Sequence, residues 1–361
     1  RLAHGRATAP DGKSSDGVGV MTAVPRIFLK RVTGVAVDDK QALGVGMLLL
    51  PPEETRAEAL LERCLQSHDF EVLCWRDVPV CTEYLGEMAL STMPKIRQVL
   101  VVDSAEGEPE TMERRLYLAR KQFERSHERG DVTGNICSLS SQTIIYKAMC
   151  TGSLLADFYP DLASEEYVTS FAIFHQRYST NTFPQWWLAQ PFRTLAHNGE
   201  INTIRGNKNW MKSHEIKMAS LAFGEQSEDI KPVIPAGASD TAALDAVFEA
   251  ICRSGRDAPT AKLMLVPEAW QADAETPQAH IDMYEYLASV MEPWDGPAAL
   301  AMTDGRWVVA GVDRNALRPL RYTLTGDNLL IVGSETGMVV VPETTIVQKG
   351  RMGPGQMIAI D

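Results

Sequence analysis

The chain has 361 residues, of which 45% are hydrophobic and 23% charged, the balance of an ordinary globular protein. Lys and Arg total 35 against 47 Asp and Glu, so the net charge is −12. That excess of negative charge argues against a general affinity for nucleic acid or for an anionic membrane. The longest apolar run, Val45–Leu50, is far too short to span a bilayer. The length allows one large domain or two of roughly 150 residues.

The six cysteines are scattered, and no two of them form a C-x-x-C pair. This spacing gives no support to zinc ribbons, iron–sulfur loops or thioredoxin motifs. We expect most of the thiols to be small buried hydrophobic groups in a reducing compartment, which is the cytoplasm. The six are Cys64, Cys74, Cys81, Cys137, Cys150 and Cys252.

The two ends of the sequence predict a piece of a longer chain. Arg1–Gly19 predicts a loop that leads directly into a strand, without the pattern of a signal peptide. The last residues, Gln356–Asp361, predict a strand that is not followed by a turn.

The first half of the chain predicts strands mixed with a long helix. Strands are expected at Val18–Ala23, Leu43–Leu50 and Ile96–Val102. A helix is expected at Glu110–His127, because its apolar residues recur at spacings of three and four. Phe171–Arg177 predicts another strand.

The second half predicts a capped helix and two hairpins. After a strand at Arg193–Asn198, the helix Ser239–Gly255 has Ser239 as its N-cap and an apolar stripe on one face. The hairpins are expected around a two-residue Asp304-Gly305 turn and a three-residue loop, Gly326-Asp327-Asn328. Their strands are Ala298–Thr303, Arg306–Gly311, Arg321–Thr325 and Leu329–Gly333. Antiparallel strands with several helices and no regular βαβ rhythm favour an α+β fold.

Polar residues that suit an amino-acid substrate gather at the ends of two predicted strands. Arg177 ends one strand, and its guanidinium can hold a carboxylate with two hydrogen bonds. Asn198 and Gly199 end the other, where a side-chain amide and a backbone N–H are the donors that an oxyanion hole needs. Asp240 begins a helix and can pair with an ammonium group.

Each of these residues also has an ordinary structural interpretation. Asn-Gly is common in turns, and a lone Arg at a strand end commonly forms a surface ion pair. An Asp at a helix start favours the helix dipole. His175 and His197 are expected to be hydrogen-bonded structural residues, because nothing pairs them at a metal-binding spacing.

Long sequence blocks carry a family resemblance over essentially the whole chain. They include CWRDVP at Cys74–Pro79, ICSLS at Ile136–Ser140, HQRYSTNTFPQWWLAQPFRTLAHNGEINTIRGN at His175–Asn207, and the blocks Met291–Thr323, Ser334–Met338 and Lys349–Asp361. With these blocks, the chain resembles the N-terminal class II glutamine amidotransferase domain of the glutamate synthase large (alpha) subunit. The resemblance assigns residues 1–361 to one such domain.

The resemblance implies an N-terminal-nucleophile hydrolase fold, a four-layer α/β/β/α sandwich with two antiparallel sheets. It also implies a mechanism in which an N-terminal Cys attacks the side-chain amide of glutamine and releases ammonia from a thioester. Asn198 and Gly199 would stabilise the oxyanion. Arg177, with Thr180 and Asn181, would hold the substrate carboxylate, and Asp240 its ammonium group.

For the parent enzyme, the resemblance implies a downstream synthase domain that makes glutamate from 2-oxoglutarate. That domain would carry FMN and a 3Fe-4S cluster, with electrons from a small (beta) NADPH-oxidising subunit. No cofactor or metal is expected in residues 1–361, and neither nucleic acid nor a membrane is expected as a partner.

The sequence departs from the family pattern at three places. The nucleophilic Cys is not among its residues, so we expect this chain to be inactive alone. Arg6 is displaced by one position in His4-Gly5-Arg6-Ala7, and Trp187 occupies a position where Pro is usual. The alternatives are a catalytically dead module that binds glutamine or acts as a scaffold, and an N-terminal-nucleophile hydrolase that acts on other amides.

Overall fold

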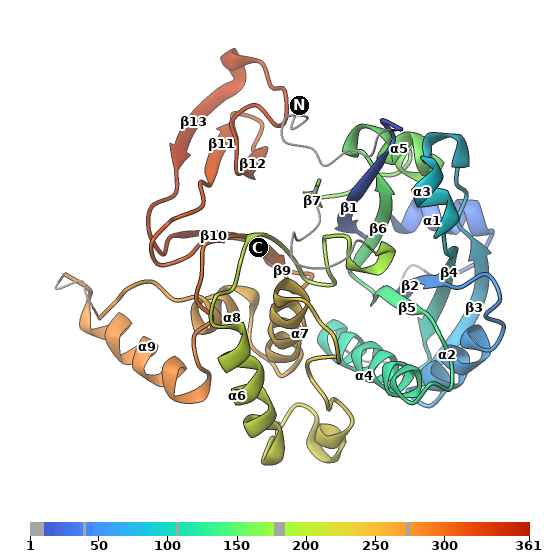
Figure 1. Ribbon diagram of the computed structural model, residues 1–361, viewed down its shortest axis with the longest axis horizontal. Helices are drawn as coiled ribbons and strands as arrows, with labels where there is room; N and C mark the ends of the chain where they lie inside the picture. Colours follow the sequence, from blue (N-terminus) through green and yellow to red (C-terminus); the bar gives the residue numbers. More distant parts are fainter. Residues whose placement is uncertain (1–10, 39–40, 106–107, 177–184, 272–274) are drawn as a thin grey trace. The chain divides into compact units, whose positions relative to one another are not determined.

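The computed structural model describes residues 11–38, 41–105, 108–176, 185–271 and 275–361 (Figure 1). These residues divide into two compact units, and each is described by itself. Unit 1 contains Thr194–Lys217 and Pro232–Asp361; unit 2 contains the described part of residues 6–193 together with Met218–Lys231.

The described residues of unit 2 form two antiparallel sheets. The first, in the order β6-β1-β7, is built from β1 (Ser14–Ala23), β6 (Thr143–Cys150) and β7 (Ala172–His175). The second, in the order β3-β4-β2-β5, is built from β2 (Leu43–Leu50), β3 (Phe70–Asp77), β4 (Lys95–Asp103) and β5 (Asn135–Ser140). Its helices are α1 (Arg26–Thr33), α2 (Ala57–Gln66), α3 (Glu87–Ser91), α4 (Pro109–Glu128) and α5 (Leu155–Phe158).

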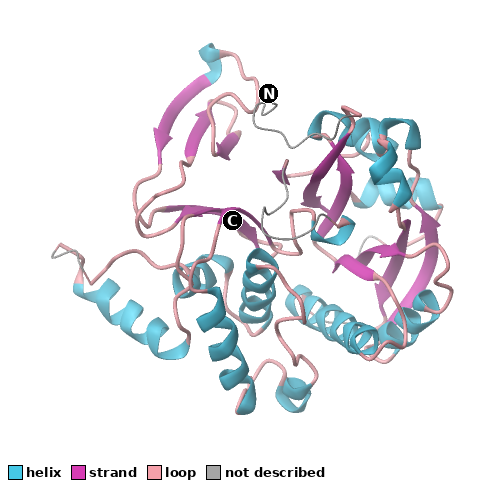
Figure 2. Ribbon diagram, viewed as in Figure 1, coloured by secondary structure: helices cyan, strands magenta, loops and turns pink. Residues whose placement is uncertain are grey.

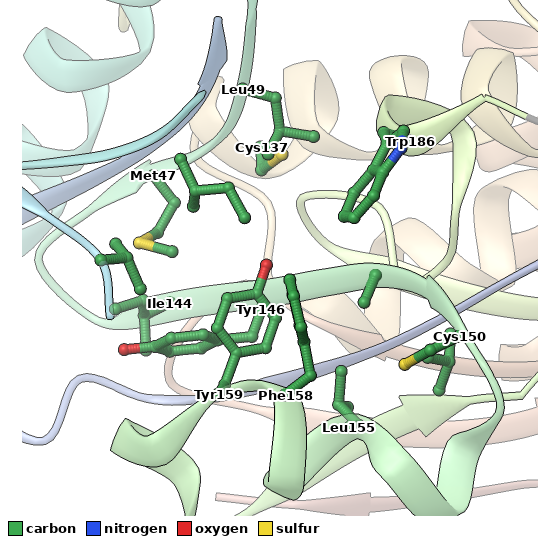
Figure 3. Close-up of a cluster of buried hydrophobic side chains, with 14 of the residues drawn as sticks. Met47, Leu49, Cys137, Ile144, Tyr146, Cys150, Leu155, Phe158, Tyr159 and Trp186 are labelled. Carbon is green, nitrogen blue, oxygen red and sulfur yellow. The ribbon is translucent and has the colours of Figure 1, made fainter. Parts of the chain in front are cut away.

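The strand β2 is buried on both of its faces, which explains its unbroken apolar sequence. Met47 and Leu49 belong to a core that includes Tyr146 of β6, as Figure 3 shows. Leu48 and Leu50, which point to the opposite face, pack in a second core formed with α2 and α4. Successive side chains of β2 therefore point alternately into two different hydrophobic cores.

A buried acid fixes the turn between β5 and β6. Glu113 of α4 is 2% exposed. Its carboxylate accepts hydrogen bonds from the hydroxyls of Ser140 and Ser141, at 3.0 and 2.8 Å, and from the Ser141 backbone N–H. A buried carboxylate is tolerated when such donors satisfy it. Glu113 thus ties the helix α4 to the hairpin.

The described residues of unit 1 form two further antiparallel sheets and four α-helices. The sheet β14-β10-β9-β8 is built from β8 (Leu195–Gly199), β9 (Ala298–Thr303), β10 (Val308–Val312) and β14 (Met357–Ile360). The sheet β12-β11-β13 is built from β11 (Arg321–Thr325), β12 (Leu330–Gly333) and β13 (Ile346–Arg351). The helices are α6 (Ile204–Ile216), α7 (Asp240–Arg253), α8 (Ala258–Leu265) and α9 (Gln278–Val290).

The hairpin of β9 and β10 corrects one prediction. Thr303 pairs with Val308, so the loop has four residues instead of the expected two, and β10 begins two residues later than predicted. The reason is the Asp304 carboxylate, which accepts hydrogen bonds from the backbone N–H groups of Arg306 and Trp307 at 2.9 and 2.8 Å. A side chain that bonds its own following backbone stabilises an Asx-type turn in place of a tight one.

Figure 2 shows helices and antiparallel strands mixed along the chain, which confirms the α+β prediction. The strands β2, β9 and β11 have the predicted bounds. Ser239 caps α7 as expected, since its hydroxyl accepts a hydrogen bond from the Ala242 N–H at 3.1 Å. None of the helices in the described ranges is both long and apolar enough to cross a membrane.

Candidate active site

The strand β8 carries Asn198 and Gly199 from the core to the surface. Leu195, Ala196 and His197 are buried, whereas Asn198 is exposed and Gly199 is half-buried. The strand lies at the end of the sheet order β14-β10-β9-β8, with β9 on one side. The two predicted oxyanion donors therefore stand where a buried strand reaches solvent.

The register of β8 determines the direction of the Gly199 N–H. Gly199 lies opposite Ala298, and the next residue, Glu200, donates its N–H to the Pro297 carbonyl at 3.0 Å. Hydrogen-bonded and non-hydrogen-bonded pairs alternate in an antiparallel ladder. Gly199 is therefore a non-hydrogen-bonded position, and its N–H points away from β9, toward the edge that no described strand of this sheet covers.

Ala298 of β9, the partner of Gly199, is also a position that makes no hydrogen bond between β8 and β9. Its N–H donates to the Asp313 carboxylate at 2.9 Å, and its carbonyl accepts from the Asp313 N–H at 3.0 Å. Both backbone groups of Ala298 are thus used on the side away from β8. Asp313, which is 2% exposed, holds the strand that supports Gly199.

Only glycine fits at position 199. Its φ is +154°, and a Cβ there would lie 1.8 Å from the Pro297 carbonyl oxygen and 2.8 Å from Nε2 of His197. Such distances are far below van der Waals contact, and φ in this region is rare for residues with a side chain. The close approach of two backbones therefore explains the Asn-Gly sequence better than a turn does.

The Asp240 carboxylate lies next to Asn198 and Gly199, and we call the end of β8 together with the start of α7 the corner. Its Oδ2 accepts a hydrogen bond from the Ile201 N–H at 3.0 Å, two residues after Gly199, and its Oδ1 accepts from the Thr241 N–H at 2.7 Å. Lys208 is close enough to interact electrostatically with Asp240, but its ammonium group donates to the Ala238 carbonyl at 2.6 Å. Among the described residues Asp240 forms no ion pair, and its carboxylate accepts these hydrogen bonds from backbone N–H groups.

His197 lies beneath the corner, between β8 and the first turn of α7. Its Nδ1 is 3.0 Å from the Thr241 hydroxyl, and the side chain is 2% exposed. Burial lowers the pKa of His197 to about 4, against the opposing effects of the Asp240 charge and the Pro297 carbonyl. The imidazole is therefore neutral at neutral pH.

The blocks that carry the family resemblance contact one another around this corner. The Asn202 N–H donates to the Asp295 carbonyl at 2.8 Å, and the Asp295 N–H donates to the Thr203 hydroxyl at 2.9 Å. The Asn207 amide donates to the Pro293 carbonyl at 3.1 Å. Sequence reasoning used both blocks but missed that the second one holds the first in place.

The remaining predicted site residues lie outside the described residues. Arg177, Thr180 and Asn181 fall in the range 177–184, and Arg6 in the range 1–10, so the carboxylate-binding part of the prediction stays a prediction. Trp187 is described and lies in unit 2, where its indole N–H donates to Gln185 at 2.5 Å and its ring packs at the edge of the core that contains Tyr146.

Five of the six cysteine thiols have pKa values shifted away from those of an activated nucleophile. Burial raises the pKa of Cys64 to about 11 and that of Cys150 to about 12. It also raises the pKa values of Cys74, Cys137 and Cys252. Reactive cysteines have the opposite shift, because the thiolate is the nucleophile.

The described ranges contain no cluster of three or more His, Cys, Asp or Glu side chains placed to hold a metal ion.

Comparison with known proteins decides the family. All of residues 1–361 match the family described as glutamine amidotransferases class-II. The chain belongs to this family. It is 50% identical over 366 residues to the glutamate synthase [NADPH] large chain of Azospirillum brasilense, covering 99% of this chain and 24% of that protein. It is 43% identical over 372 residues to ferredoxin-dependent glutamate synthase 1, chloroplastic/mitochondrial, of Arabidopsis thaliana, covering 100% of this chain and 23% of that protein.

This class II amidotransferase chain thus spans about a quarter of the length of these curated relatives. A solved structure of the allosteric regulatory enzyme of purine biosynthesis is 13% identical over 96% of this chain and 47% of its own, with a TM-score of 0.35. The predicted family is confirmed by the match over the whole chain. The four-layer arrangement of its sheets stays a prediction.

Proposed function

We propose that this chain is the glutaminase part of a glutamate synthase, in which it hydrolyses glutamine to glutamate and ammonia. The observation that supports this function best is the direction of the Gly199 N–H. It points to an uncovered sheet edge beside the exposed Asn198 amide, in the same corner as Asp240. Two hydrogen-bond donors and a carboxylate that forms no ion pair with the described residues are the groups that a glutamine side-chain amide and α-ammonium require.

In this proposal the corner binds the two ends of one substrate. Asp240 holds the α-ammonium, while Arg177, Thr180 and Asn181 hold the α-carboxylate. When a thiolate attacks the side-chain carbonyl, its oxygen gains negative charge and accepts hydrogen bonds from the Gly199 N–H and the Asn198 amide. One such donor contributes about 2.7–4 kcal/mol to the transition state.

The attacking thiolate is the family's N-terminal Cys, which is not one of the six cysteines of this sequence. It adds to the amide carbonyl, and the amide nitrogen leaves as ammonia after it receives a proton. Water then attacks the resulting thioester and releases glutamate, which restores the thiol.

The proposal places the other activities of the parent enzyme outside this chain. A synthase part of the same polypeptide would use the ammonia and 2-oxoglutarate, with FMN and a 3Fe-4S cluster. A small NADPH-oxidising subunit would supply electrons, and the enzyme would work in the cytoplasm. The relatives named as NADPH-dependent and ferredoxin-dependent glutamate synthases support this class of parent enzyme.

The test uses the protein expressed from its complete reading frame, with ammonia release from glutamine as the measurement. Asn198→Ala should lower kcat by about 10²–10³ with little change in KM, because it removes a donor that acts in the transition state. Asp240→Asn should mainly raise KM, because the substrate ammonium is bound before and during reaction.

Asn209→Ala is the matched control, because Asn209 is exposed on α6. It should leave both constants unchanged. A complete protein that binds glutamine without releasing ammonia would instead support the scaffold interpretation, and equal rates with asparagine would support a different amidase.

A further inference from the structure

The side chain of His197 joins the two halves of the proposed site. On one side its Nδ1 lies 3.0 Å from the hydroxyl of Thr241, in the first turn of α7. On the other side the ring lies against the backbone of the corner, since a Cβ built on Gly199 would be 2.8 Å from Nε2 and 1.8 Å from the Pro297 oxygen. The ring therefore fills the space between the helix start and the strand end.

Thr241 continues this connection to Asp240. The Thr241 hydroxyl lies 3.4 Å from Asp240 Oδ1, and the same oxygen accepts the Thr241 N–H at 2.7 Å. The other carboxylate oxygen accepts the N–H of Ile201 at 3.0 Å. The contacts from His197 through Thr241 and Asp240 to Ile201, together with the backbone from His197 to Ile201, form a closed path that contains Asn198 and Gly199.

Three members of this closed path are buried. His197 is 2% exposed, Thr241 1% and Ile201 3%. In such surroundings hydrogen bonds are stronger than in water and side chains have one arrangement. A neutral imidazole also adds no positive charge that would compete with a substrate ammonium for Asp240.

We propose that His197 and Thr241 are positioning residues that fix the distance between the Asp240 carboxylate and the oxyanion donors Asn198 and Gly199. This distance must match the separation between the α-ammonium and the side-chain carbonyl of the substrate. The pair therefore contributes to the preference for glutamine over asparagine, which is shorter by one methylene. The inference rests on the proposed glutaminase function.

The test compares three variants of the protein expressed from its complete reading frame. Thr241→Val keeps the shape of the side chain and removes the hydroxyl, whereas Thr241→Ser keeps the hydroxyl. Thr303→Val is the matched control, because Thr303 is also 1% exposed and its hydroxyl accepts a backbone hydrogen bond from Gly305 at 2.9 Å. The measurements are kcat and KM for glutamine, kcat/KM for asparagine, and Tm.

Thr241→Val should lower kcat/KM for glutamine by about 10- to 100-fold, because small misplacements of reacting groups have effects of this size. Both constants should change, with kcat falling and KM rising, and the preference for glutamine over asparagine should narrow. Thr241→Ser should restore most of the loss. Thr303→Val should lower Tm without changing kcat/KM.

The outcomes separate this inference from the proposed function. If the wild type is active and Asp240→Asn is impaired but Thr241→Val behaves as the wild type, the positioning role is wrong and the function stands. Equal losses in Thr241→Val and Thr303→Val also overturn it, because they indicate only lower stability. An inactive complete wild type overturns the proposed function and this inference with it.

Discussion

Two carboxylates, one in each unit, show how the type of partner decides what a buried or half-buried acid does. In unit 2, Asp161 is held by two hydrogen bonds of 2.7 Å from the Arg76 guanidinium and a third of 3.0 Å from the Tyr146 hydroxyl. In unit 1, Asp240 is held by the backbone N–H groups of Ile201 and Thr241. Both carboxylates are well satisfied by hydrogen bonds.

The two carboxylates differ in the net charge of the group that each forms with its hydrogen-bond partners. The guanidinium cancels the charge of Asp161, so that cluster contributes only to the fold. Backbone amides fix the orientation of Asp240 but leave its negative charge in place. A carboxylate oriented by amides is therefore suited to a cationic ligand, whereas one oriented by arginine is not.

The largest expected effect is at the corner of unit 1. Gly199→Ala should lower glutaminase activity of the complete protein by more than about 10³-fold, because the added Cβ cannot fit 1.8 Å from the Pro297 oxygen and must displace the oxyanion donors. Steady-state ammonia release measures the loss. Retention of even a tenth of the activity would remove Gly199 from the proposed role.

The next effect concerns the charge-neutral cluster of unit 2. Asp161→Asn leaves the Arg76 guanidinium, whose side chain is 12% exposed, without its carboxylate, and should lower the free energy of unfolding by about 3–5 kcal/mol. Urea unfolding measures the change. Asp131→Asn is the control, because the Arg129–Asp131 pair is exposed and should contribute less than about 1 kcal/mol. Equal effects would contradict the comparison.

A third prediction compares the pH ranges in which one residue of each unit affects the stability of the fold. The pKa of His197 is lowered from 6.5 to about 4 in the folded protein. As the pH falls below about 6.5, this imidazole is protonated in the unfolded chain but not in the folded one, so stability should fall between about pH 6.5 and 4. Glu54 of unit 2 has a pKa lowered from 4.5 to about 2 by hydrogen bonds from the backbone of Thr133 and Arg56, so its contribution is lost only below about pH 4.5.

Unfolding free energies measured over a pH series should show the two windows. His197→Gln should flatten the profile between about pH 6.5 and 4 and leave the lower window unchanged. Glu54→Gln should flatten only the lower window. A His197→Gln profile parallel to that of the wild type would contradict the assignment.

The smallest effect is at a glycine that has no steric role. Gly206 lies in α6, and a Cβ added to it would have no atom of a neighbouring segment within 4 Å. Gly206→Ala should raise the free energy of unfolding by about 0.5–1 kcal/mol, because alanine loses less conformational entropy in a helix. Activity should not change. Comparison with Gly199→Ala isolates the effect of the close backbone contact.

Local patterns were enough to predict much of the fold. Apolar runs gave the bounds of β2 and β9, and Ser239 with the apolar stripe after it gave the start of α7. The Asp304-Gly305 turn was predicted wrongly, because the dipeptide pattern does not show that the Asp304 carboxylate bonds the backbone two and three residues later.

For the site, sequence alone identified Asn198, Gly199 and Asp240 as candidates, and the structure places them in one corner; their roles stay predictions. The contacts that Thr241 and Pro297 make with these residues were missed. They depend on the register of β8 against β9 and on the packing of α7, which join segments about 40 and 100 residues apart in the chain. No local pattern carries that information.

The position of β8 at the rim of its sheet has a consequence for assembly as well as for chemistry. A strand at the end of a sheet can pair with an added extended peptide, and such a peptide would use the Gly199 N–H that the proposed mechanism assigns to the substrate oxygen. In the proposed mechanism, the substrate oxygen and an added strand would therefore compete for the same N–H group. Because β8 has five residues and ends at Gly199, an added peptide would find few backbone groups to pair with, whereas the proposed substrate needs only this one N–H.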